Sequence, residues 1–208
     1  MKFPSSGLYA ITKTEGLTPQ QTIDSVSAAI RGGAKVIQYR DKNRRFPISI
    51  ACALSSLCHQ SNIPFIVNDD IELAAHIGAD GVHLGKDDHS FDNAKHLLGS
   101  DSIVGISCYS SLEKAKAAQH LGATYVAFGR FFPSKSKPEA PFANLDVLKQ
   151  VHIHIPVVAI GGITLDNGRI LLNAGADLLA VIDAVCGRKN PEQAARQFKE
   201  LFTGNHVK

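Results

Sequence analysis

The chain has 208 residues, of which 44% are hydrophobic and 20% are charged, a composition that is typical of a globular protein and excludes a disordered polymer. Its formal net charge of +3 and its dispersed Lys and Arg residues argue against a nucleic-acid partner but leave room for a small anionic ligand. No stretch reaches the roughly 18 consecutive apolar residues of a membrane span, and the start lacks a secretory signal, so we expect a cytoplasmic protein without a membrane partner.

Short apolar runs alternate with helical segments along the whole chain. The pattern predicts strands at residues 7–12, 35–39, 65–67, 81–84, 102–106, 124–128, 156–160 and 177–182. It predicts helices at residues 19–31, 47–60, 71–77, 90–98, 111–121, 144–151, 165–174 and 191–202. Thr18 and Pro19 mark one helix start, and the Gly-Ala pairs at 33–34, 78–79, 122–123 and 175–176 end helices directly before strands.

Eight strands and eight helices in strict alternation favour a parallel sheet with crossover helices. We therefore predict a single-domain TIM (β/α)₈ barrel that spans residues 1–208. A doubly wound open sheet is the alternative. It fits less well because no GxGxxG motif opens the first helix.

Two clusters of acids follow neighbouring strands. Asp69 and Asp70 come directly after residues 65–67, and Asp87 and Asp88 follow residues 81–84. Because a βαβ crossover makes its strands parallel, both clusters should open onto one edge of the sheet, where their charges repel unless a cation lies among them. Mg²⁺ suits such oxygen ligands. The alternative is that Asp70 caps the next helix and that the second pair faces solvent.

In a TIM barrel the residues just after the strands form the active site. Arg40 and Lys42 alternate with Asp41, so we expect the two cations to share a face. The other polar candidates after the strands are Gln38, Asn68, Asp69, Asp88, Ser107, Ser134, Ser136, Lys137, Gly161, Gly162 and Asp183. This combination suits a substrate with more than one phosphate and a bridging metal. The double glycine also fits a tight turn, and Lys137 also fits a solvated loop.

Seven segments resemble, in order, the motifs of the thiamine phosphate synthase family. They are VIQYRDK at 36–42, IVNDD at 66–70, GVHLGKDD at 81–88, GIS at 105–107, FPSKSK at 132–137, AIGGI at 159–163 and AVIDAV at 180–185. The resemblance implies a TIM-barrel transferase. It would join 4-amino-2-methyl-5-hydroxymethylpyrimidine diphosphate to a thiazole phosphate, giving thiamine phosphate and diphosphate, with Mg²⁺ as cofactor and small molecules as its partners. The oligomeric state stays open, with a homo-oligomer among the options.

The resemblance also assigns roles to residues. The metal ligands would be Asp69 and Asp88. The residues that hold the pyrimidine diphosphate would be Gln38, Arg40, Lys42, Asn68, Ser107 and Lys137, with Tyr39, Asp41 and Lys135 beside them. The thiazole phosphate would lie at Ser134, Ser136, Gly161, Ile182 and Asp183. Catalysis would be electrostatic, with Mg²⁺, Arg40, Lys42, Ser107 and Lys137 acting on a diphosphate that leaves before the thiazole nitrogen attacks.

Two positions depart from the family pattern. Asp183 stands where the family has Ser, and its carboxylate would repel a phosphate unless it is turned away or paired. Lys86 replaces Gln and adds a cation beside the acid pair. The alternatives to the transferase are a thiazole tautomerase-like relative, a metal-free isomerase barrel that binds phosphate, and a non-catalytic binding protein. The presence of Asp69 and Asp88 favours the transferase.

Overall fold

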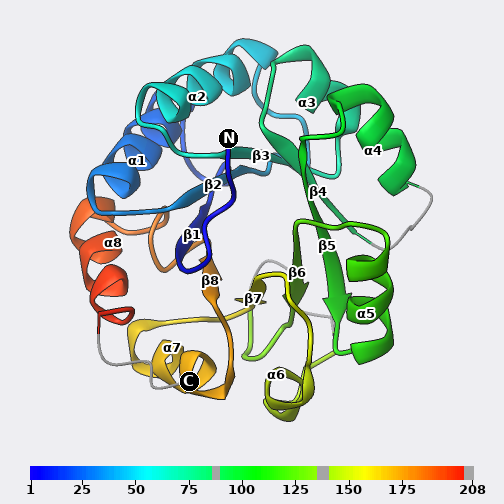
Figure 1. Ribbon diagram of the computed structural model, residues 1–208. Coiled ribbons are helices and arrows are strands. Elements are labelled where there is room, and N and C mark those ends of the chain that lie inside the picture. Colours follow the sequence, from blue (N-terminus) through cyan, green and yellow to red (C-terminus); the bar gives the residue numbers. More distant parts are fainter. Residues whose placement is uncertain (86–89, 135–140, 204–208) are drawn as a thin grey trace.

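The computed structural model describes residues 1–85, 90–134 and 141–203. Eight strands form a closed parallel barrel in the order β1 to β8, and helices surround it (Figure 1). This confirms the predicted TIM barrel and excludes the doubly wound sheet. In the described residues, no helix combines the length and the apolar character that a membrane crossing requires.

The strands are short, and each pairs in parallel with its two neighbours. They are β1 (Gly7–Ile11), β2 (Val36–Tyr39), β3 (Phe65–Asn68), β4 (Gly81–Leu84), β5 (Ile103–Tyr109), β6 (Tyr125–Phe128), β7 (Val157–Ile160) and β8 (Leu178–Val181). The barrel closes where β1 pairs with β8, with Leu8 opposite Leu179. Because all strands run the same way, the residues that follow them meet at one end of the barrel.

A helix follows each strand. They are α1 (Pro19–Arg31), α2 (Ile48–Gln60), α3 (Ile71–His76), α4 (Ser90–Leu98), α5 (Leu112–His120), α6 (Asp146–Gln150), α7 (Leu165–Ala174) and α8 (Pro191–Glu200). The expected start of α1 is present: the Thr18 side chain accepts from the Gln21 backbone N–H, and the Gln21 side chain accepts from Thr18 N–H at 2.8 Å. The predicted bounds agree to within a few residues.

The largest difference from the prediction lies in β5, which continues to Tyr109 instead of ending at Ile106. The pairing with β6 shifts register between Ser107 and Tyr109, and Tyr109 has a positive φ of 57°. A bulge of this kind lets a strand continue past an irregularity. As a result, Ser107 lies inside a paired strand and its side chain is held in the barrel.

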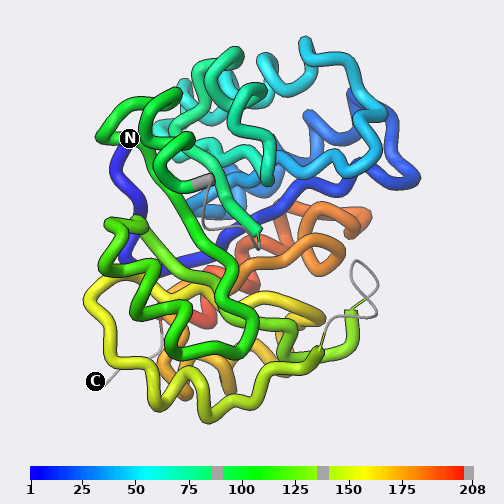
Figure 2. Tube along the Cα trace, turned by 90° about the vertical axis from the view of Figure 1, so that its right-hand side faces the viewer, coloured from blue at the N-terminus to red at the C-terminus, as the bar shows by residue number. Residues whose placement is uncertain are grey.

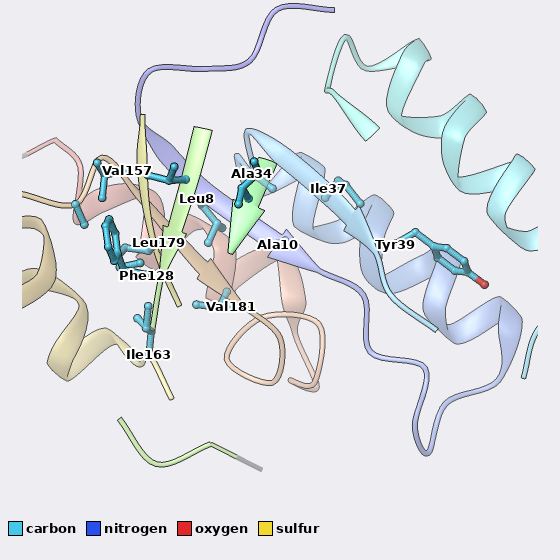
Figure 3. Close-up of a cluster of buried hydrophobic side chains, with 14 of the residues drawn as sticks. Leu8, Ala10, Ala34, Ile37, Tyr39, Phe128, Val157, Ile163, Leu179 and Val181 are labelled. Carbon is cyan, nitrogen blue, oxygen red and sulfur yellow. The ribbon is translucent and has the colours of Figure 1, made fainter. Parts of the chain in front are cut away.

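The hydrophobic core has two layers, one outside the barrel and one inside it. Outward-facing residues such as Leu8, Ile37 and Phe128 pack between the strands and the helices (Figure 3). A second cluster fills the barrel itself and includes Tyr9 and Tyr125, which are 1% and 0% exposed. Strand alternation sends successive side chains to these two layers.

Phe3 closes the amino end of the barrel. Its ring stacks on Tyr125 with the centroids 4.3 Å apart and the planes 5° apart, and it meets Tyr9 edge-on at 6.4 Å. The segment before β1 therefore runs beneath the strands, and its N-terminus lies on the left in Figure 2. Phe3 thereby supports Tyr9 and Tyr125, which line the cavity at the other end of the barrel.

Candidate active site

The carboxyl ends of the strands surround a cavity of about 890 Å³. This volume is near the upper end of the range for small-molecule sites, which suits two substrates bound side by side. The predicted site residues that line the cavity are Gln38, Arg40, Asn68, Asp69, Ser107, Ser134, Gly161, Gly162, Ile182 and Asp183. They come from β2, β3 and β5 and from the loops after β2, β3, β6, β7 and β8, so the rule of residues after strands finds part of the site.

Three residues assigned by resemblance do not line the cavity. Tyr39 lies on the outer face of β2, and its hydroxyl donates to Asp41 Oδ2 at 3.4 Å. The same oxygen accepts from the Phe46 backbone N–H at 2.9 Å, so Asp41 supports the loop instead of facing a ligand. Lys42 is exposed in the turn that follows, and it does not share the cavity face with Arg40, because strand alternation ends at this turn. The other assigned residues, Asp88, Lys135, Ser136 and Lys137, lie outside the described residues.

Arg40 provides a half-buried positive charge at the cavity wall. Its backbone N–H donates to Thr12 Oγ1 at 2.8 Å, which ties the ends of β1 and β2 together. Burial lowers the pKa of the guanidinium, and the nearby carboxylates of Asp69 and Glu15 oppose this shift. Among the described residues, the buried Nη2 of Arg40 has no hydrogen-bond partner. An anionic ligand would satisfy this donor.

Asp69 stands at the end of β3 with a φ of 61°, a left-handed conformation that Asp and Asn tolerate better than most residues. Its backbone N–H donates to His83 O at 2.9 Å. The Asn68 amide donates to Asp69 Oδ2 at 2.7 Å, and a Cβ placed on Gly85 would lie 3.4 Å from Oδ1. The carboxylate therefore lies beside the chain that leaves β4.

Asp70 has a different role from its neighbour. Its Oδ1 accepts from the Leu73 N–H at 2.9 Å, and its Oδ2 pairs with Arg44 at 3.1 Å. It is the N-cap of α3, and it does not line the cavity. The alternative interpretation of this residue as a helix cap is therefore correct.

Gly161 and Gly162 allow the loops after β6 and β7 to pack against each other. Their φ angles are 103° and 65°. A Cβ on Gly161 would lie 2.2 Å from Arg130 Cβ, and one on Gly162 would lie 2.3 Å from Pro133 O. Real Cβ atoms do not approach so closely, so both glycines are required by the packing of these loops. The tight-turn interpretation is therefore part of their role.

Asp183, which departs from the family pattern, forms an ion pair with Lys13. The two residues follow β8 and β1, the strands at which the barrel closes, and both line the cavity. A cation therefore offsets the carboxylate, which removes most of the repulsion expected from the sequence. Arg130 and Arg188 also line the cavity. The sequence interpretation missed Lys13, Arg130 and Arg188, although the first directly follows a predicted strand.

A row of polar side chains crosses the bottom of the cavity. Gln38 Nε2 donates to Tyr9 Oη at 2.9 Å, and Tyr9 Oη lies 2.8 Å from Tyr125 Oη. Tyr125 Oη lies 3.0 Å from His83 Nδ1, and His83 Nε2 lies 2.9 Å from Ser107 Oγ. We call these five side chains the polar relay. Its ends, Gln38 and Ser107, are both predicted site residues.

A closed parallel barrel with a charged cavity at the carboxyl ends of its strands has the architecture of a TIM-barrel enzyme. The profile of the family described as thiamine monophosphate synthase matches residues 8–185. A thiamine-phosphate synthase of Methylococcus capsulatus is 48% identical over 97% of this chain and 92% of its own length. One of Nitrosococcus oceani is 46% identical over 94% of this chain and 92% of its own.

The solved structure of a thiamine phosphate pyrophosphorylase from Pyrococcus furiosus has 35% identity and a TM-score of 0.83, and each chain covers 95% of the other. The chain therefore belongs to the thiamine monophosphate synthase family. It is a transferase of thiamine biosynthesis that forms thiamine phosphate. The family resemblance of the sequence is confirmed.

Proposed function

We propose that this enzyme joins 4-amino-2-methyl-5-hydroxymethylpyrimidine diphosphate to a thiazole phosphate and releases diphosphate. The observation that best supports these substrates is the half-buried Arg40 guanidinium, which lines the same cavity as Asp69 and whose buried Nη2 has no partner among the described residues. A diphosphate satisfies such a donor, and its oxygens can share a divalent ion with a carboxylate. The presence of the Asp69 carboxylate in the same cavity as Arg40 favours the transferase over a tautomerase-like relative.

In this proposal the two halves of the cavity hold different substrates. Gln38, Arg40, Asn68 and Ser107, together with Lys42 and Lys137, bind the pyrimidine diphosphate, with Tyr39, Asp41 and Lys135 beside them. Ser134, Ser136, Gly161, Ile182 and Asp183 hold the thiazole phosphate. The described members of the two sets that line the cavity come from different sides of the barrel, because the first set lies in or just after β2, β3 and β5 and the second lies in the loops after β6, β7 and β8.

The residues present fit a Mg²⁺ ion as cofactor. Asp69 offers a carboxylate at the cavity, beside Gly85 in the chain that leads toward Asp88. Magnesium is usually bound by one or two carboxylates, with waters and substrate phosphates completing its shell. In the described part of the chain, no cluster gathers three or more His, Cys, Asp or Glu side chains, so a cage made entirely of protein groups is not expected there. When bound, Mg²⁺ would neutralise negative charge on the diphosphate.

The chemistry then needs positioning and charge stabilisation. The bond between the pyrimidine methylene and the diphosphate oxygen breaks first, and its electrons leave with the diphosphate. The thiazole nitrogen then donates its lone pair to the cationic methylene carbon. Arg40 stabilises the leaving group by charge-assisted hydrogen bonds through its guanidinium, and the partial burial of this group strengthens the interaction. No protein nucleophile is required.

An assay with both substrates tests the proposal. We expect the purified enzyme to form thiamine phosphate and diphosphate in equal amounts when both substrates and Mg²⁺ are present. Omission of either substrate, or chelation of the metal with EDTA, should abolish the product, and added Mg²⁺ should restore it. Turnover that is unaffected by EDTA would contradict the metal assignment, and absence of product with both substrates would contradict the substrates.

The ion pair of Lys13 with Asp183 leads to a separate prediction. Lys13→Ala should raise the KM for thiazole phosphate, because an unpaired carboxylate would then face the phosphate. Since both side chains are partly exposed, we expect an increase of about two- to tenfold, which corresponds to less than about 1.4 kcal/mol. Asp183→Ser in the same variant should return the KM toward the value of the parent enzyme.

Steady-state kinetics of the two single variants and the double variant measure this coupling. The KM for the pyrimidine diphosphate is the internal control, because the pair lies at the β1–β8 side of the cavity and should leave that value within about twofold. If Lys13→Ala leaves the KM for thiazole phosphate unchanged, the phosphate does not bind near this pair.

A further inference from the structure

We assign the polar relay one direction of hydrogen bonding, that in which the Gln38 amide nitrogen faces Tyr9 and each hydroxyl hydrogen within the relay meets an acceptor. The Gln38 amide nitrogen can only donate, so Tyr9 Oη accepts from it and gives its own hydrogen to Tyr125 Oη. Tyr125 in turn donates to His83 Nδ1, which leaves His83 Nε2 protonated and donating to Ser107 Oγ. The Ser107 hydroxyl hydrogen then remains available to a ligand. One amide orientation at β2 thus sets the hydrogen-bonding state of a hydroxyl on β5.

Burial keeps the relay in this state. Tyr9 and Tyr125 are fully enclosed, and loss of solvation raises the pKa of both phenols, so they stay protonated. Phe3 stacks on the Tyr125 ring from below, and Gly105 leaves room for that ring beside His83. The relay residues therefore have little freedom to exchange partners with solvent. A reversed direction would require the Gln38 amide to turn over, with its oxygen accepting from Tyr9.

The composition of the relay differs from that of an ordinary barrel interior. Barrel interiors are dominated by Val, Ile and Leu, yet these five polar side chains meet at the base of a ligand cavity, and all of them line it. Five apolar residues would fill the same space without the need to satisfy buried donors and acceptors. This suggests that the relay serves the ligand as well as the fold.

We infer that Tyr9, Tyr125 and His83 are positioning residues that fix which atoms of Gln38 and Ser107 face the pyrimidine ring. The inference rests on the proposed function and adds the origin of specificity for the pyrimidine. The Gln38 side chain has no hydrogen bond with the described residues beyond the one to Tyr9, so its amide oxygen and second N–H can serve a ligand.

A 4-aminopyrimidine presents an N–H donor beside a ring-nitrogen acceptor, and an amide oxygen with its adjacent N–H complements both. A 4-oxopyrimidine presents the reverse order, so it would face like groups unless the amide turned over. Because Tyr9 holds the amide by its other hydrogen, the turned state would require every hydrogen bond of the relay to reverse, including a change of the His83 tautomer. We therefore expect the enzyme to discriminate between the 4-amino substrate and the 4-oxo analogue by roughly ten- to a hundredfold, the scale of one bidentate pair.

Tyr9→Phe and Tyr125→Phe test the relay, since each removes one hydroxyl and retains the ring. Either variant should raise the KM for pyrimidine diphosphate by about tenfold and reduce the discrimination against the 4-oxo analogue, measured from its inhibition constant, to about twofold. The KM for thiazole phosphate should stay within about twofold. Because the groups act in series, the double variant should be no worse than either single variant.

Thr124→Val is the matched control. It also removes a hydroxyl next to Tyr125, but the Thr124 hydroxyl accepts from the Val104 N–H at 3.1 Å and lies outside the cavity. This variant should lose stability in a thermal melt while both KM values and the discrimination stay unchanged. The parent enzyme is assayed with both substrates in parallel. If the parent makes no product, the proposed function is wrong; if the parent is active and the variants are unchanged, only the inference about the relay is wrong.

Two results would overturn the inference. The first is a Tyr9→Phe or Tyr125→Phe enzyme that keeps the KM for pyrimidine diphosphate and the discrimination of the parent. The second is a double variant in which the effects of the two single variants add and in which the KM values for both substrates rise together. That result would indicate a general loss of packing in the barrel. If one variant fails to fold, the other decides between these outcomes, because a break at either hydroxyl interrupts the relay.

Discussion

Asp69→Asn is expected to lower kcat by at least about a hundredfold at saturating Mg²⁺, with little change in thermal stability. Removal of one group that stabilises developing charge typically costs a factor of this size or more. Asn keeps the shape of the side chain and tolerates the left-handed φ of 61°, so the backbone should stay in place. Ala would add strain at this position and would confuse the two effects. The variant therefore isolates the loss of the carboxylate charge.

The measurement is initial rate against Mg²⁺ concentration, with Asp70→Asn as the matched control. Asp70 is the adjacent aspartate, and its carboxylate caps α3 through the Leu73 N–H at 2.9 Å. Asn also caps helices well, so this control should retain the activity and the Mg²⁺ dependence of the parent. Full activity of Asp69→Asn would refute its assignment as a metal ligand. Equal losses in both variants would point to a local change in structure.

Gly105→Ala is expected to destabilise the barrel and to inactivate the enzyme. An added Cβ would lie 2.0 Å from Tyr125 Cζ and 2.4 Å from its hydroxyl oxygen. The ring cannot move aside, because it is fully buried, stacked on Phe3 and 5.9 Å from the Tyr9 ring. Overpacking of a core costs about 1–3 kcal/mol, and displacement of Tyr125 also breaks the polar relay in the middle. Urea denaturation and a turnover assay measure the two effects.

A double-mutant cycle with Tyr125→Leu identifies the cause. Leu leaves space where the ring was, so the added methyl group should cost much less in the Tyr125→Leu background than in the parent. Turnover should return in part, while the KM for pyrimidine diphosphate should stay raised, because the relay still lacks the Tyr125 hydroxyl. If the free-energy changes simply add, the clash with Tyr125 is not the source of the destabilisation, and Gly105 has another role.

The sequence predicted the barrel well because its signals are local. The Thr18–Pro19 helix start and the Gly175–Ala176 stop each depend on backbone groups that neighbouring residues satisfy. In the structure, Gly175 has a φ of 118°, and its N–H and that of Ala176 return to the carbonyls of Leu172 and Leu171. Such signals fix the boundaries of the elements, and the alternation of eight strands with eight helices fixes the topology. The register shift in β5 has no comparable local signal, and its length was underestimated.

The site was predicted only in part, because the rule used for it concerns the ends of strands. It found Arg40, Asp69 and Ser107, which do line the cavity. It failed for Lys42, since alternation stops when the chain turns. It also missed Tyr9 and Tyr125, which lie within strands and look like ordinary core residues in sequence. Only the closed barrel brings β1 and β6 together across its interior, so no local pattern links these two side chains to the site.

The stacked Phe3 ring also bears on the order of events in a catalytic cycle. With the amino end of the barrel sealed beneath Tyr125, both substrates enter and both products depart through the same opening. In the proposed arrangement the pyrimidine reaches the polar relay at the base of the cavity, so we expect sequential loading in which the pyrimidine diphosphate binds first. Because both substrates share one opening, we expect substrate inhibition: the second substrate can bind near the opening before the first and form a dead-end complex.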